Sequence, residues 1–273
     1  MKKTCQYLND KKQRGEKITM LTCYDYPTAV WEDEAGVDII FVGDSVGTNV
    51  LGYESEREVT MDDMVHHLRA VRRGVSTAYL LCDLPYMTCE TPEQALENAS
   101  LLLSHGADGV KLEGFKPNIV KHLAEHEIEV CAHLGLNPQI HDKAGLKAKE
   151  VDSAIKLIED SLALEEAGAC FIVYEVVPEE VAQEATQRLS IPTIGIGAGR
   201  HTDGQVLIVS DMLGINAFDL RHSKKFEDFH GRAIKAIEAY VSDVQRGLFP
   251  EERHARHLQT FELEAFKKKI RLL

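Results

Sequence analysis

The chain of 273 residues has room for one large α/β domain or two small ones. Hydrophobic residues make up 44% and charged residues 27%, a balance typical of a water-soluble globular protein. The net charge of −13 disfavours nucleic acid as the main partner, because phosphate binding needs a basic surface. No window approaches the roughly 20 apolar residues of a membrane span. We therefore expect a protein that binds neither nucleic acid nor a membrane.

The cysteines and the first residues indicate a cytoplasmic location. None of the six cysteines belongs to a C-x-x-C pair, and Cys82, Cys131 and Cys170 lie in apolar runs typical of strands. We interpret the cysteines as reduced core residues, not as a disulfide framework or a zinc site. The charged start is followed by no apolar stretch, so we expect no signal peptide.

Short apolar runs alternate with amphipathic segments along most of the chain. The predicted strands cover residues 18–23, 37–43, 77–82, 109–114, 129–134, 169–175, 192–197 and 205–210. Helices over 60–74 and 91–106 are predicted to begin after the capping residues Thr60 and Thr91, the second with Pro92 in its first turn. Further helices are predicted over 151–168, 178–190 and about 223–246.

Eight strands that alternate with helices predict a single (β/α)8 TIM barrel. An open doubly wound sheet is the alternative, but no G-x-G-x-x-G follows the first strand, which disfavours a dinucleotide-binding version. Only about residues 199–204 separate the last two strands, so the seventh βα unit is predicted to be truncated.

The last part of the chain is predicted to be helical. We expect the helix over about 223–246 to close the barrel. In the tail from Phe261, one helical face carries Leu263, Phe266, Ile270 and Leu273, which favours packing on the body or on a neighbouring subunit. Without a repeat or a linker, residues 1–273 are predicted to form one domain.

Polar side chains occur at the ends of five consecutive predicted strands, where barrel enzymes place their active sites. In chain order they are Asp44 and Ser45, Asp83, Lys111 and Glu113, His133, and Glu175. Because side chains alternate along a strand, Lys111 and Glu113 point to the same side. Carboxylates that converge from adjacent strands repel one another unless a hard cation lies among them, and oxygen ligands favour Mg²⁺ over zinc. The pattern therefore predicts a Mg²⁺ site.

Each of these residues also has a purely structural interpretation. The alternatives are a turn or cap at Asp44, an Asx turn at Asp83, an ion pair between Lys111 and Glu113, a core histidine at His133 and a helix start at Glu175. Five consecutive strands end this way, however, which favours a functional site. The glycines at 195, 197 and 199 could cradle an anion, but we favour tight turns.

Long blocks of the sequence resemble the ketopantoate hydroxymethyltransferase family. They are MLTCYDYPTA (20–29), FVGDSVGTNVLG (41–52), TMDDMVHHLRAVRRG (60–74), CDLPYMTCETPEQALENA (82–99), GADGVKLEG (106–114), HLGLNPQ (133–139), YEVVPEE (174–180), IPTIGIGAG (191–199) and TDGQVLIVSDMLG (202–214). The resemblance implies a (β/α)8 enzyme of the phosphoenolpyruvate/pyruvate superfamily. Such an enzyme transfers a hydroxymethyl group from 5,10-methylenetetrahydrofolate to 3-methyl-2-oxobutanoate through a Mg-stabilised enolate. The product, 2-dehydropantoate, is a precursor of pantothenate.

The resemblance also implies roles for individual residues. The implied Mg²⁺ ligands, direct or through water, are Asp44, Asp83 and Glu113. The implied contacts of the oxo acid are Asp44, Ser45, Asp83, Lys111 and His133. Glu175 matches the proton acceptor of the family. The family further implies a homo-oligomer, often a decamer.

The chain departs from the family pattern in several segments. Asn137-Pro138-Gln139 and the loop 140–150 differ from the usual sequence, and this loop is expected to help cover the site. Phe115 replaces a glycine, the segment 221–232 is altered, and the tail beyond about 255 has no counterpart. The alternatives are another Mg-dependent C–C lyase or transferase acting on a different 2-oxo acid, and a non-catalytic scaffold.

Overall fold

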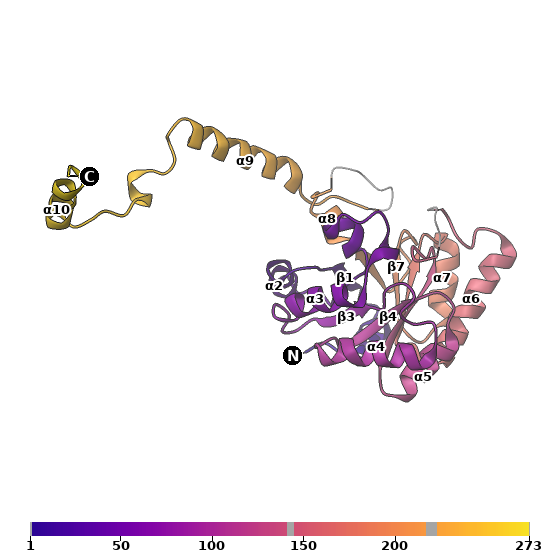
Figure 1. Ribbon diagram of the computed structural model, residues 1–273. Coiled ribbons are helices and arrows are strands. Elements are labelled where there is room, and N and C mark those ends of the chain that lie inside the picture. Colours follow the sequence, from indigo (N-terminus) through magenta and orange to yellow (C-terminus); the bar gives the residue numbers. More distant parts are fainter. Residues whose placement is uncertain (1, 141–144, 217–222, 273) are drawn as a thin grey trace. The chain divides into compact units, whose positions relative to one another are not determined.

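The computed structural model describes residues 2–140, 145–216 and 223–272, and contacts divide the chain into two compact units, 1–227 and 228–273. Within the described residues, the first unit contains a closed barrel of eight parallel strands in sequential order (Figure 1). The strands are β1 (Ile18–Thr22), β2 (Ile39–Val42), β3 (Tyr79–Asp83), β4 (Gly109–Glu113), β5 (Glu129–Gly135), β6 (Phe171–Glu175), β7 (Thr193–Ile196) and β8 (Gly204–Leu207). The predicted (β/α)8 barrel is confirmed.

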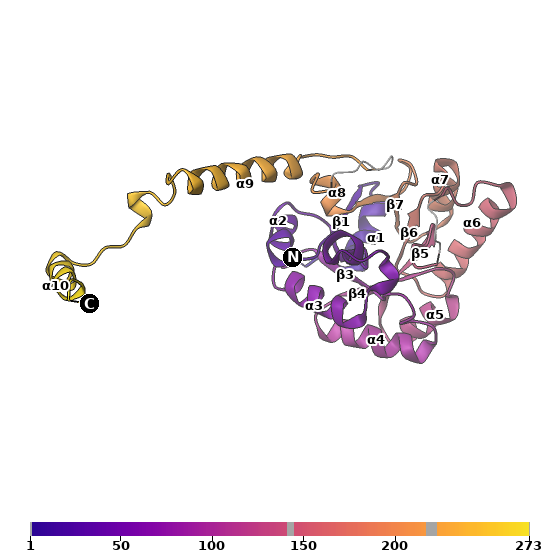
Figure 2. The same ribbon diagram turned by 45° about the horizontal axis from the view of Figure 1, so that its top comes forward.

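Helices lie around the barrel, on its outside and at its ends (Figures 1 and 2). In the first unit they are α1 (Cys5–Gln13), α2 (Tyr26–Glu34), α3 (Met61–Arg72), α4 (Pro92–Ser104), α5 (Pro117–Glu125), α6 (Val151–Glu166), α7 (Glu179–Arg188) and α8 (Val209–Met212). The predicted caps are present, because the side chains of Thr60 and Thr91 accept hydrogen bonds from the N–H groups of Asp63 and Gln94. Between β7 and β8 the described chain forms no helix, which confirms the truncated seventh unit.

The amino-terminal helix α1 is a feature that the sequence did not predict. Its Cys5 and Leu8 are buried in the cluster inside the barrel, together with Ile18 of β1 and Tyr79 of β3, which begin their strands. The helix therefore closes the barrel at the end where the strands start. The opposite end, where the strands finish, carries the polar residues.

The predicted interior positions of the cysteines are largely confirmed. Five of the six are buried, and Cys170 is partly exposed. Among the described residues, no helix is long and apolar enough to cross a membrane.

The second unit contains α9 (Phe229–Gln245), the short 3-10 helix η3 (Glu252–His254) and α10 (Thr260–Ile270). The helix predicted over about 223–246 is thus present from Phe229, with no buried side chain, but its contacts place it outside the barrel unit. The predicted tail helix is present as α10; Leu273 lies outside the described residues, as do 221 and 222 of the altered segment. That α9 closes the barrel, and that the chain forms one domain, stay predictions.

Glu32 is a buried residue of α2 whose carboxyl group is expected to make the stability of the protein depend on pH. It is 4% exposed, and neither carboxyl oxygen has a hydrogen-bond partner among the described residues. Burial, with a smaller effect of Asp25, raises its pKa to about 9. The folded protein therefore keeps a proton that an unfolded glutamate, with a pKa of about 4.3, releases.

Stability is therefore expected to fall as pH rises between these two pKa values, with this group contributing up to about 1.4 kcal/mol per pH unit. Glu32→Gln removes the contribution, so its unfolding free energy relative to the wild type should increase from about pH 5 to about pH 9. Urea titrations of both proteins across this range measure the difference. A constant difference would contradict the assignment.

Candidate active site

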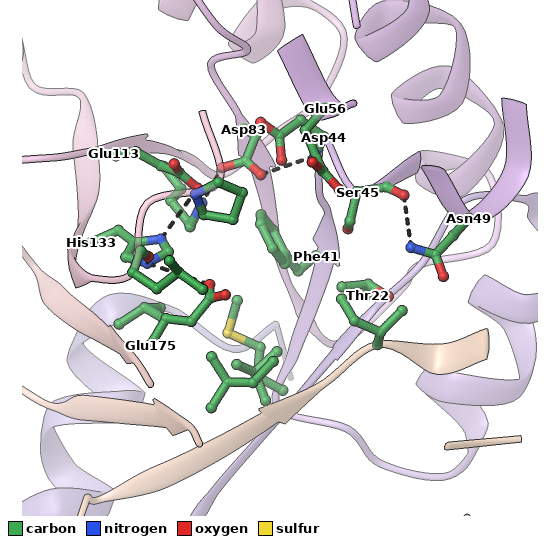
Figure 3. Close-up of a pocket in the computed structure, with 18 of the residues that line it drawn as sticks. Thr22, Phe41, Asp44, Ser45, Asn49, Glu56, Asp83, Glu113, His133 and Glu175 are labelled. Atoms are coloured by element: carbon green, nitrogen blue, oxygen red, sulfur yellow. Dashed lines mark hydrogen bonds and ion pairs between the residues drawn. The ribbon is translucent and has the colours of Figure 1, made fainter. Parts of the chain in front are cut away.

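A cavity of about 310 Å³ opens where the barrel strands end (Figure 3). Its floor is apolar and includes Met20, Phe41, Val173, Ile196 and Val206. All the predicted site residues line it, namely Asp44, Ser45, Asp83, Lys111, Glu113, His133 and Glu175. The structure therefore brings them together, whereas their individual roles stay predictions.

Strand register explains why these side chains meet. Asp83 is paired with Lys111 across β3 and β4, Glu113 with His133 across β4 and β5, and Glu175 with Gly135 across β5 and β6. In a closed barrel, alternate residues of each strand face inward. The two-residue spacing of Lys111 and Glu113 thus places both side chains at the mouth of the cavity.

Lys111 is the cation among the described residues that line the cavity. Its Nζ lies 2.7 Å from Oδ1 of Asp83 and 3.6 Å from Oε1 of Glu113. The same atom lies 5.3 Å from the centre of the Phe41 ring. Burial favours the neutral amine, but Asp83, Glu113 and Asp44 outweigh it and raise the pKa of Lys111. The lysine is therefore charged at neutral pH.

Three carboxyl groups surround this single charge. The N–H of Asp44 donates to Oδ2 of Asp83 at 3.0 Å, which holds the two residues side by side. Burial, followed by the nearby Asp83, raises the pKa of Asp44 to about 8. Burial raises that of Glu113 to about 7, and it also raises that of Asp83. Negative charge at this wall is thus only partly compensated by the protein itself.

His133 lies between Glu113 and Glu175 in Figure 3. Nε2 of His133 donates to the carbonyl of Leu136 at 2.8 Å and lies 3.5 Å from Oε2 of Glu175. Burial and the charge of Lys111 lower the pKa of His133, so the ring is neutral. Its Nδ1 lies 3.5 Å from Glu113 and has no hydrogen-bond partner among the described residues. Burial, and then Glu113, raises the pKa of Glu175 to about 8.

Ser45 belongs to a separate hydrogen-bonded group at the rim. Its Oγ lies 2.8 Å from the hydroxyl of Tyr24, and its carbonyl accepts from the Asn49 side chain at 3.0 Å. Asn49 lies in the π-helix η1 (Gly47–Leu51), and its Oδ1 accepts from Ser210 Oγ at 2.6 Å. Strand periodicity does not point to Tyr24, which lies in the loop after β1, or to Asn49, which lies in a short π-helix without a periodic pattern.

The carboxylate oxygens of the cavity can be compared with the ligands that a metal ion requires. Among the described residues, no three Asp, Glu, His or Cys side chains are arranged to hold an ion between them. Asp44 and Asp83 are adjacent, however, and offer only oxygen atoms. Mg²⁺ in proteins often takes one or two carboxylates and completes its octahedron with water and substrate. The two adjacent carboxylates fit Mg²⁺ bound in this way.

Gly135 shapes this part of the site, and its replacement should be costly. The residue has φ +105°, and an added Cβ would lie 2.2 Å from the Glu175 carbonyl oxygen and 2.7 Å from Cγ2 of Val177. Gly135→Ala is expected to lower the unfolding free energy by at least about 2 kcal/mol, through backbone strain and overpacking. The matched control is Gly145→Ala, where no atom of the described residues lies within 4 Å of the added atom. Equal thermal unfolding of the two variants would contradict the prediction.

Known structures share this barrel. A phosphonopyruvate hydrolase, solved with oxalate and Mg²⁺, aligns with a TM-score of 0.61 at 10% identity, covering 99% of this chain and 97% of that one. A 2,3-dimethylmalate lyase of the PEP mutase/isocitrate lyase superfamily aligns with a TM-score of 0.59 at 13% identity, covering 100% and 98%. The closed barrel and the acid-lined cavity at its strand ends define the class of protein as a (β/α)8 barrel.

Sequence comparisons identify the family. The sequence profile of ketopantoate hydroxymethyltransferase matches residues 2–252. The 3-methyl-2-oxobutanoate hydroxymethyltransferase of Dehalococcoides mccartyi strain 195 is 47% identical, over 98% of this chain and 98% of its own length. The chain belongs to the ketopantoate hydroxymethyltransferase family. The resemblance inferred from the sequence blocks is thereby confirmed.

Proposed function

We propose that the protein transfers a hydroxymethyl group from 5,10-methylenetetrahydrofolate to 3-methyl-2-oxobutanoate and forms 2-dehydropantoate for pantothenate biosynthesis. The family membership supports this reaction. The observation that carries it is the grouping of Lys111 with Asp83, Asp44 and Glu113 at one wall, with Glu175 beside them at the mouth of the cavity. This grouping offers a binding place for an oxo acid and a base close to it.

Mg²⁺ is proposed to bind at Asp44 and Asp83, with Glu113 acting through water. When bound, it would supply a Lewis acid to the keto and carboxylate oxygens of the oxo acid. Lys111 adds a positive charge at the same wall, and the hydrogen bond from its Nζ to Oδ1 of Asp83 fixes the position of the ammonium group. Charge that develops on the keto oxygen would therefore be stabilised by preorganised groups in a site largely shielded from water.

The remaining residues orient the oxo acid. Ser45, held by the hydroxyl of Tyr24, offers a hydrogen bond at the rim. His133 is neutral, with Nε2–H directed at the Leu136 carbonyl, so its Nδ1 is a hydrogen-bond acceptor. The apolar floor, which includes Val173 and Val206, suits a branched alkyl group.

Glu175 is proposed as the general base that removes the proton from C3. A base works best when its pKa lies near the operating pH, and burial raises that of Glu175 to about 8. Its side chain is 19% exposed, which leaves a path for the proton to solvent. Water would release the methylene carbon from the two nitrogens of tetrahydrofolate at the oxidation level of formaldehyde, and tetrahydrofolate would leave. The deprotonated C3 would then add to this carbon, and the alkoxide formed would take up a proton to give the hydroxymethyl group. The protein is further proposed to work as a cytoplasmic homo-oligomer.

Product formation tests the proposal directly. The protein is incubated with 3-methyl-2-oxobutanoate, tetrahydrofolate and ¹³C-formaldehyde, which together generate the labelled co-substrate, with Mg²⁺ or with EDTA. We expect the ¹³C NMR signal of the new hydroxymethyl carbon of 2-dehydropantoate only with Mg²⁺ and protein. Absence of this product, with turnover of another 2-oxo acid, would instead support a different Mg-dependent C–C lyase or transferase.

A further inference from the structure

Gln139 is a buried residue that contacts two of the proposed metal carboxylates. Its side-chain Nε2 donates to Oδ2 of Asp44 at 2.7 Å and to the carbonyl of Leu84 at 3.2 Å. Its backbone N–H donates to Oε2 of Glu113 at 3.1 Å. Gln139 itself is 5% exposed, so these donors face the carboxylates without competition from bulk water.

These hydrogen bonds occupy one carboxylate oxygen of Asp44 and leave its other oxygen available to a ligand. Oδ2 of Asp44 is occupied by the amide of Gln139, whereas Oδ1 of Asp44 accepts no hydrogen bond within the described parts of the chain. Buried carboxylates of like charge repel one another and would otherwise turn apart or take up protons. An amide donor fixed on one oxygen holds the carboxylate plane and presents the other oxygen. The backbone N–H of the same residue restrains the Glu113 carboxylate by its own hydrogen bond.

Gln139 is itself held from outside the cavity. Its carbonyl accepts a hydrogen bond from Nε of Arg57 at 2.9 Å. Arg57 lies in the 3-10 helix η2 (Glu56–Glu58), between β2 and α3, and its guanidinium lies 5.7 Å from the ring centre of Tyr86, which follows β3. Segments that follow β2, β3 and β5 therefore meet at this glutamine, in contact with the Asp44 and Glu113 carboxylates.

We propose that Gln139 is a positioning residue that orients the Asp44 and Glu113 carboxylates to receive the divalent cation. Cation affinity is thereby coupled to the position of the segment after β5. The inference depends on the proposed Mg²⁺ function, and it adds a residue to which neither strand periodicity nor the family resemblance assigned a role. Groups that hold metal ligands by hydrogen bonds commonly change metal affinity by 10- to 100-fold when they are replaced.

The test measures cation affinity without substrate. Mn²⁺, a paramagnetic substitute for Mg²⁺, is titrated into the full-length protein and followed by electron paramagnetic resonance. Gln139→Met keeps the length of the side chain but removes both amide bonds, so we expect the Mn²⁺ Kd to rise by about 10- to 100-fold. The matched control is Gln205→Met, which removes amide bonds to Gly199 and Thr202 elsewhere and should leave the Kd unchanged.

A second variant and a kinetic measurement separate positioning from simple loss of structure. Gln139→Asn keeps an amide but draws it back by one methylene, and the Kd should rise as in Gln139→Met. At saturating Mn²⁺, both variants should recover most of kcat, a recovery that a damaged fold would not allow.

The outcomes distinguish this inference from the proposed function. Wild-type affinity, within about twofold, in either variant that keeps its thermal unfolding temperature would overturn the positioning role alone. A wild-type protein that binds no Mn²⁺ would contradict the proposed metal function, and the inference with it.

Discussion

Glu175→Gln is expected to slow proton removal from C3 of 3-methyl-2-oxobutanoate by about 10³-fold, while the oxo acid still binds. The amide has nearly the same shape as the carboxyl group, but it cannot accept the proton at neutral pH. Deuterium incorporation at C3 in D₂O, followed by ¹H NMR, measures the step, and calorimetry measures binding.

The control is Glu179→Gln on α7, which contacts Arg200 outside the cavity and should leave exchange unchanged. Wild-type exchange in Glu175→Gln would exclude this residue as the base.

The pH dependence of exchange follows from the same group. Glu175 must be ionised to act as a base, and its pKa without a cation is raised to about 8. Bound Mg²⁺ would stabilise the ionised form and lower this pKa. Exchange by the wild type should therefore increase with pH and level off at or below about pH 8. The rise should be absent in Glu175→Gln. A rate that falls with increasing pH over this range would contradict the assignment.

Asp83→Ala is expected to lower the rate of Mg²⁺-dependent turnover by at least about 10²-fold, in a protein that remains folded. Asp83 holds Lys111 and the N–H of Asp44, and it is a proposed cation ligand. Its loss also relieves repulsion among buried acids, and Lys111 keeps Glu113 as a partner at 3.6 Å. Turnover against Mg²⁺ concentration and circular dichroism measure the two effects.

Asp38 provides a contrasting control at the other end of the barrel. It is also buried, and its carboxylate binds Lys11 at 2.7 Å and the N–H of Thr19 at 2.9 Å. Asp38→Ala should lower stability, because it leaves buried donors unpaired, but the remaining activity should keep its Mg²⁺ dependence. If Asp83→Ala behaved like Asp38→Ala, the cation assignment would be wrong.

The site could be predicted to the extent that strand geometry dictates it. Lys111 and Glu113 were placed together because side chains alternate along a strand, and Asp83 and His133 because parallel strands finish at the same end of a barrel. The register of the neighbouring strands confirms these placements.

Other features escaped prediction because no periodic pattern specifies them. Gln139 reaches Asp44 across 95 positions of sequence, from a loop whose path depends on tertiary contacts. Helix α1 is short and weakly patterned, and its place beneath the barrel depends on the burial of only two residues, Cys5 and Leu8. Helix α9 could be predicted as a helix, because its apolar residues recur with the period of an amphipathic helix. The surface against which its apolar face packs could not be predicted from this pattern.

The central claim is that this cavity activates C3 of a 2-oxo acid with the help of a divalent cation. The most direct measurement is deuterium exchange at C3 of 3-methyl-2-oxobutanoate by the wild-type protein in D₂O, with Mg²⁺ or with EDTA. We predict exchange with Mg²⁺, little exchange with EDTA, and conversion to 2-dehydropantoate when the methylene donor is added. No exchange and no product under any of these conditions would contradict the account.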